Sequence, residues 1–115
     1  MQEVHRKLSV ECFNKCWTYI DRPDRSAADA ETMVLLAYAS LYHWTQRVDC
    51  SSTSLSVGYW KVSRVHALAG QYQAAKQFGE RCLAVGRENR LAPFYVGYAY
   101  EALARACAVA GNRKE

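Results

Sequence analysis

Glu101 and Arg105 stand one helical turn apart in AYEALARACAVAG (99–111), a segment made otherwise of small, apolar and tyrosine residues. A carboxylate and a guanidinium at this spacing can form an ion pair, which contributes only about 0.2–0.5 kcal/mol when exposed. One interpretation is therefore an intrahelical pair beside a solvated cleft. The other is that both groups belong to the wall of a binding surface.

Trp60, Arg64 and Tyr98 are the side chains that could complete such a surface. Aromatic and arginine residues carry much of the binding energy at protein interfaces. A guanidinium such as that of Arg64 can also bind a carboxylate through two hydrogen bonds. Together with Glu101 and Arg105, these residues predict a recognition surface for a peptide or an acidic ligand.

His43 provides an alternative of another class, because an imidazole can act as a base or ligand near neutral pH. An inter-helix cavity around His43, Arg64, Glu101 and Arg105 would indicate a small enzyme or small-molecule binder. The competing interpretation is structural, since a histidine near a helix end is favoured by the helix dipole. His5 is expected to be exposed.

Enzyme signatures are missing from the sequence, which contains no P-loop, GxGxxG, GxSxG or HExxH motif. The five cysteines form no CxxC pair, and the histidines show no known metal-ligand spacing. We therefore expect no cofactor, no metal site and no catalytic residue that can be named, and a non-enzymatic role is favoured.

The 115 residues fit one domain, and the 15 basic and 11 acidic residues are scattered. Phosphate binding needs clustered positive charge, so nucleic acid is not an expected partner. No apolar run approaches the length of a membrane span. An odd number of cysteines without a signal peptide favours reduced thiols and a cytoplasmic location.

Helical periodicity and capping residues predict an all-α fold. Pro23 and Pro93 mark helix boundaries, Ser26 resembles an N-cap, and Gly70 and Gly111 resemble C-terminal stops. The expected helices cover about 4–20, 27–46, 54–69, 72–86 and 92–110. The segment 27–46 is apolar on nearly every side, which predicts that it is the central helix.

The segment YWKVSRVHALAGQYQAAKQFGERCLAV (59–85) resembles the tetratricopeptide repeat, a helix–turn–helix unit. Gly70, Tyr72 and Ala75 take the places of the turn and the early second helix, and Ser63 takes the small position where helices approach closely. The usual aromatic position holds Gly79, one residue after Phe78.

The segments ASLYHW, GYWKVSRV, ERCL and AYEALARA are also similar to an uncharacterised bacterial family with tetratricopeptide-like helices, a resemblance that brings no activity with it. The resemblance implies one domain, 1–115, built as a right-handed array of antiparallel helical hairpins. It places Trp60, Arg64, Tyr98, Glu101 and Arg105 on the inner, concave surface, and so implies a protein- or peptide-binding module.

The last helix is apolar nearly all round, with Val96, Leu103 and Cys107 on one flank. In repeat proteins each unit buries its face on its neighbour, and large exposed apolar patches are unusual on monomers. We therefore expect homo-oligomers formed through this flank, or a natural chain that continues into a capping helix.

Overall fold

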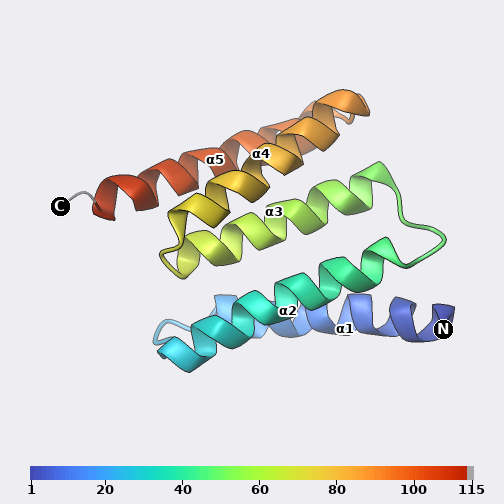
Figure 1. The fold of residues 1–115 in the computed structure, drawn as a ribbon, viewed down its shortest axis with the longest axis horizontal. Helices are drawn as coiled ribbons and strands as arrows, with labels where there is room; N and C mark the ends of the chain where they lie inside the picture. Colours follow the sequence, from blue (N-terminus) through green and yellow to red (C-terminus); the bar gives the residue numbers. More distant parts are fainter. Residues whose placement is uncertain (114–115) are drawn as a thin grey trace.

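The computed structural model describes residues 1–113, which form five α-helices and no strand (Figure 1). The helices are α1 (Gln2–Ile20), α2 (Ala27–Thr45), α3 (Ser52–Leu68), α4 (Tyr72–Glu88) and α5 (Pro93–Arg113). The all-α expectation is confirmed. The observed helix boundaries differ from the expected ones by up to three residues. The largest difference is at the end of α5, which continues past Gly111 where a stop was expected. Residues 114–115, the end of the expected domain, lie outside the described residues.

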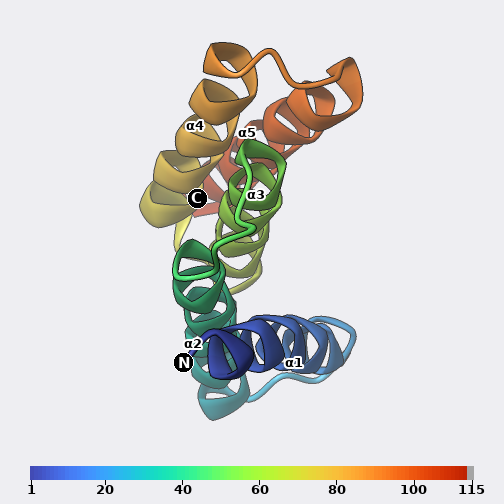
Figure 2. The ribbon, with the colours of Figure 1, turned by 90° about the vertical axis from the view of Figure 1, so that its right-hand side faces the viewer.

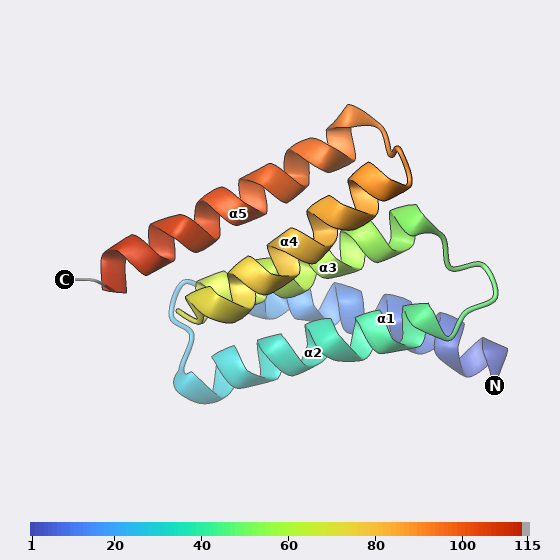
Figure 3. The same cartoon turned by 45° about the horizontal axis from the view of Figure 1, so that its top comes forward.

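Consecutive helices run in opposite directions and pack as hairpins, with α3 in the middle of the molecule (Figures 1 and 3). α3 contacts α2, α4 and α5, whereas α2 contacts α1 and α3. In the view of Figure 2, α1 and α5 project to the same side of α3, while α2 and α4 lie on the other side. The helices thus form an array with two distinct faces.

The prediction that 27–46 is the central helix is wrong. Leu35 and Tyr42 of α2 are 60% and 56% exposed, while α3 buries Lys61, Val62 and Ser63 almost completely. Hydropathy gave the wrong prediction because the burial of a helix depends on how many other helices pack against it. More helices pack against α3 than against α2. The main apolar core lies between α1, α2 and α3 and comprises Cys16, Ile20, Met33, Ala37, Val62 and Val65.

Small residues allow α3, α4 and α5 to approach closely. Ser63 is fully buried, and its Oγ donates a hydrogen bond of 2.7 Å to the carbonyl oxygen of Ala75 in α4. A Cβ at Gly79 would lie 2.9 Å from Leu103 Cδ2 and 3.5 Å from Ser63 Oγ. This contact leaves no room for a side chain at position 79, and the neighbouring Phe78 stacks on His66.

Both turns that flank α4 use the same hydrogen-bonding pattern. After α3, Gly70 adopts a left-handed φ of 78° and Gln71 N–H donates to the carbonyl of His66. After α4, Arg90 adopts a φ of 52° and Leu91 N–H donates to the carbonyl of Gly86. Both turns are Schellman motifs. In the second one the left-handed position is held by Arg90, whose side chain makes this conformation sterically unfavourable. The N-cap at Ser26 is confirmed as a capping box with Asp29.

A row of polar side chains on α1 joins its first half to the end of α2. His5 was expected to be exposed, but it is buried because it faces this junction. We call this row the polar seam, and its three members on α1 are Gln2, His5 and Ser9. Gln2 bonds with the backbone of Gln46 and Val48, His5 Nδ1 lies 2.9 Å from His43 Nδ1, and Ser9 bonds with Ser40 and Arg47.

Candidate functional site

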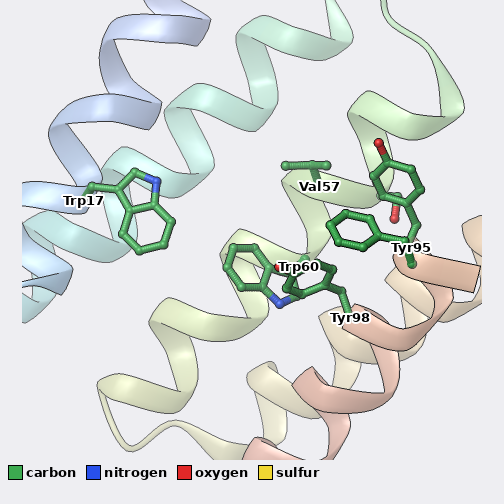
Figure 4. A pocket seen from close by; sticks show the side chains of 7 residues that line it. Trp17, Val57, Trp60, Tyr95 and Tyr98 are labelled. Atoms are coloured by element: carbon green, nitrogen blue, oxygen red, sulfur yellow. The ribbon is translucent and has the colours of Figure 1, made fainter.

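A pocket of about 290 Å³ lies between α1, α3 and α5, and we call it the aromatic pocket (Figure 4). Its lining residues are Trp17 from α1, Ser56, Val57 and Trp60 from α3, and Phe94, Tyr95 and Tyr98 from α5. A second pocket, of about 320 Å³, is bounded by α1, α2 and α3 and shares Val57 as a lining residue with the aromatic pocket. The two pockets together form what we call the groove.

The rings of Trp60 and Tyr98 meet edge to face, with centroids 5.4 Å apart. Phe94 in turn packs edge to face on Tyr98 at 4.9 Å, and Trp17 lies 6.3 Å from Trp60 across the pocket. Such contacts hold the rings in defined orientations. The structure therefore brings the sequence candidates Trp60 and Tyr98 together, in a wall suited to an apolar side chain.

Arg64 lies one turn beyond Trp60, with its guanidinium carbon 5.9 Å from a Trp60 ring centroid. Its Nε is buried and has no hydrogen-bond partner among the described residues. Burial lowers the pKa of Arg64, the nearby Arg105 lowers it further, and Glu101 opposes both effects. The guanidinium is thus a partly desolvated cation beside Trp60, a residue that lines the aromatic pocket.

Glu101 and Arg105 form the expected i,i+4 ion pair, with Nε and Oε1 3.4 Å apart. Both side chains are nearly half exposed, so the pair contributes little to stability. Glu101 and Arg105 of α5 act electrostatically on Arg64 of α3. Pairwise relations thus connect the five candidates from the sequence, because Trp60 contacts Tyr98 and lies near Arg64.

Sequence reasoning missed Lys61, whose side chain is 1% exposed. Its Nζ lies 3.6 Å from the ring centroid of Trp17 and 3.8 Å from that of Phe13, with no hydrogen-bond partner in the described structure. Burial lowers the pKa of Lys61 to about 8. The helical register could have indicated this burial, because Lys61 lies on the same helix face as Gly58 and Val65.

Trp17 is a further residue that was not among the sequence candidates, and it forms the α1 side of the aromatic pocket. Its ring separates the pocket from the Lys61 ammonium group. Nothing in the local sequence of α1 indicates this role, because the pocket exists only where α1 meets α3 and α5.

His43 lies in the polar seam, where its ring contacts His5 and Tyr42. The structure thus does not group it with Arg64, Glu101 and Arg105. His66 is held by the Tyr38 hydroxyl and the Gln71 side chain, each at 2.7 Å. Among the described residues, no group of three or more potential metal ligands occurs.

The flank of α5 that was expected to mediate self-association does not form one exposed surface in the structure. Val96 and Leu103 face α4, because a Cβ at Gly86 or Gly79 would lie within 3.2 Å of their side chains. Cys107 is exposed. The large exposed side chains of α5 are instead Phe94, Tyr98 and Tyr100.

No helix in residues 1–113 combines the length and apolar character needed to cross a bilayer. Comparisons with protein-family models, with curated proteins and with solved structures found no match to this chain.

Proposed function

We propose that this chain is a protein- or peptide-binding module and that the groove receives a segment of the partner. The observation that carries the proposal is the aromatic pocket, which three helices build from Trp17, Trp60 and Tyr98 with their neighbours. Rings of this kind present large contact areas at low conformational cost, and they dominate binding energy where they are clustered.

The size of the pocket favours a side chain of a polypeptide over an enzyme substrate. At about 290 Å³ it lies at the lower limit for small-molecule sites, which span roughly 300–1,000 Å³. Burial of one large apolar side chain contributes about 1.5–3 kcal/mol, so useful affinity requires further contacts along the groove. The second pocket, beyond Val57, offers such contacts.

We propose a right-handed tetratricopeptide-like arrangement for the hairpins. Three features support it: the Gly70 turn, the close contact at Ser63, and the alternation of the helices between two faces. The five cysteines are unpaired, which supports a reducing compartment such as the cytoplasm.

We also propose self-association through α5, supported by the exposure of Phe94 and Tyr100 at 64% and 47%. The expected result is a sedimentation coefficient that rises with protein concentration and a lower dimer fraction for Phe94→Ser. A monomer at all concentrations up to about 100 μM, well above typical dissociation constants, would exclude this second role.

Selection from a random peptide display library tests the groove. Selected peptides should bind the parent protein at least tenfold more tightly than Tyr98→Ala, a change worth about 1.4 kcal/mol. Tyr42→Ala is the control, because Tyr42 is also an exposed tyrosine but lies on α2 and lines neither pocket. Peptides that bind all three proteins equally, or a selection without enrichment, would refute the proposal.

A further inference from the structure

We propose that the groove selects an acidic segment, in which a bulky apolar side chain and a carboxylate lie two residues apart in an extended conformation. The apolar side chain occupies the aromatic pocket and the carboxylate pairs with Arg64. This inference rests on the proposed function, since it names the chemistry of the partner that the groove accepts.

Unused hydrogen-bond donors on α3 indicate the charge of the partner. Trp60 Nε1, Lys61 Nζ and Arg64 Nε are buried, and none has a hydrogen-bond partner among the described residues. All three are donors and two belong to cations. Acceptors of a partner would satisfy Trp60 and Arg64, whereas Lys61 lies behind the Trp17 ring and acts on the groove only through its charge. Buried polar groups are normally paired. An acceptor that also carries a negative charge would both accept a hydrogen bond and offset the positive charge of Arg64 and Lys61.

The cation under the pocket wall adds to this preference. Lys61 is almost fully buried, with its Nζ against the Trp17 ring that faces the pocket. No carboxylate in the described structure forms an ion pair with it, so its charge is uncompensated at contact distance. Charges interact strongly where water is excluded, so the field in the groove favours an anionic partner and opposes a cationic one.

The acidic residues near Arg64 do not neutralise it. Asp21 and Glu101 raise the pKa of Arg64 at a distance, but neither forms an ion pair with it in the described structure. The nearest carboxylate on α5 is already engaged by Arg105. Arg25 also acts on Arg64, but it donates to backbone carbonyls at the end of α1. Arg64 is therefore the cation left for a partner.

The spacing of Trp60 and Arg64 along α3 sets the spacing of the motif. Trp60 and Arg64 are four residues apart on α3, which corresponds to a rise of about 6 Å. In an extended peptide, side chains at i and i+2 lie on the same face about 6.6–6.8 Å apart. One apolar residue and one acidic residue at this spacing can therefore engage both positions together.

The test measures the fluorescence anisotropy of labelled peptides with blocked termini, so that only side chains carry charge. The probes contain Trp-Ser-Glu and the reverse order Glu-Ser-Trp in a Gly-Ser background, each paired with a version that has Gln in place of Glu. In at least one order, the acidic probe should bind the parent at least tenfold more tightly than its Gln version. Added salt should weaken this preference.

Arg64→Gln should remove the preference for Glu over Gln, while Arg81→Gln, an exposed change on α4, should leave it intact. Arg64→Lys retains the charge but not the planar fork and should give an intermediate preference. Circular dichroism and thermal unfolding of each variant establish that it is folded.

Two results overturn the inference: equal binding of the Glu and Gln probes in both orders, or no acidic probe binding below about 1 mM. In both cases the display selection decides separately about the groove. Neutral or basic peptides that lose affinity on Tyr98→Ala leave the proposed function in place, whereas a failed selection removes both.

Discussion

The Nδ1 atoms of His5 and His43 lie 2.9 Å apart and join the first turns of α1 to the end of α2. This distance fits a hydrogen bond in which one nitrogen carries the proton and the other accepts it. The contact is the middle member of the polar seam, between those made by Gln2 and Ser9. The packing of α1 on α2 therefore includes a direct contact between two imidazoles.

Removal of this contact should weaken the packing of α1 on α2. His5 is buried, and its Nδ1 has the Nδ1 of His43 as its hydrogen-bond partner. Replacement of His5 by alanine leaves the partly buried His43 nitrogen without this partner, which costs about 1–3 kcal/mol. We therefore expect His5→Ala to lower the free energy of unfolding by this amount, measured by urea unfolding at neutral pH.

His5→Asn is the comparison for this prediction. The side-chain amide of asparagine can donate or accept a hydrogen bond, so this variant should lose less stability than His5→Ala. Equal stability of the parent and His5→Ala would show that the contact between the two imidazoles does not hold α1 on α2.

Lys61→Met should stabilise the protein at neutral pH by about 1–3 kcal/mol, because it removes a buried charge. The lower value allows for the lost contacts between the ammonium group and the rings of Phe13 and Trp17. Chemical unfolding at about pH 7 measures the difference. A variant less stable than the parent would mean that these ring contacts outweigh the burial cost.

The same residue predicts how stability changes in mild alkali. The pKa of Lys61 falls from 10.5 to about 8 on folding, so above about pH 8 the folded protein loses a proton that the unfolded chain retains. The stability of the parent should therefore rise relative to Lys61→Met by about 1 kcal/mol between about pH 7 and pH 9. Parallel curves for the two proteins would contradict the prediction.

Gly79→Ala and Gly97→Ala should have opposite effects, although both glycines lie within helices. A Cβ at Gly79 would meet Leu103 at 2.9 Å and force α4 and α5 apart, which should cost about 1–3 kcal/mol. A Cβ at Gly97 would have nothing within 4 Å, so alanine should stabilise the helix by about 1 kcal/mol. Thermal unfolding of both variants checks the contrast.

Arg90→Gly should stabilise the turn between α4 and α5 by about 1 kcal/mol, because glycine adopts the left-handed conformation without steric cost. Gly70→Ala should cost about as much at the equivalent position after α3. The sum of the two effects in the double variant should be close to zero, as expected for separate sites. Loss of stability on Arg90→Gly would show that its side chain contributes contacts of its own.

Local signals in the sequence were sufficient to find the helices. Pro93, the Ser26 capping box and the Gly70 turn act within a few residues, so they can be identified without knowledge of the fold. The stop at Gly111 failed because glycine permits a helix end but does not require one. The placement of Trp60 and Tyr98 on one face came from the resemblance to the tetratricopeptide repeat, and the rings of the two residues are in contact.

Features that depend on contacts between helices were missed. The burial of His5 and Lys61 arises where α1 meets α2 and α3, and neither residue type indicates burial. The central place of α3 was missed for the same reason, because its Lys61 and Ser63 are polar but packed. Hydropathy measures the preference of a side chain for a buried or an exposed position. Which helix is surrounded by others depends instead on how the helices pack in the array.

The place of α3 also governs how the molecule should melt. The α1–α2 hairpin reaches α4 and α5 chiefly through this one helix, so disorder that begins at either end must pass through it to reach the other. Arrays of this kind behave as a series of nearest-neighbour couplings. A peptide clasped between α1 and α5 would bridge the two ends directly and make their unfolding more cooperative.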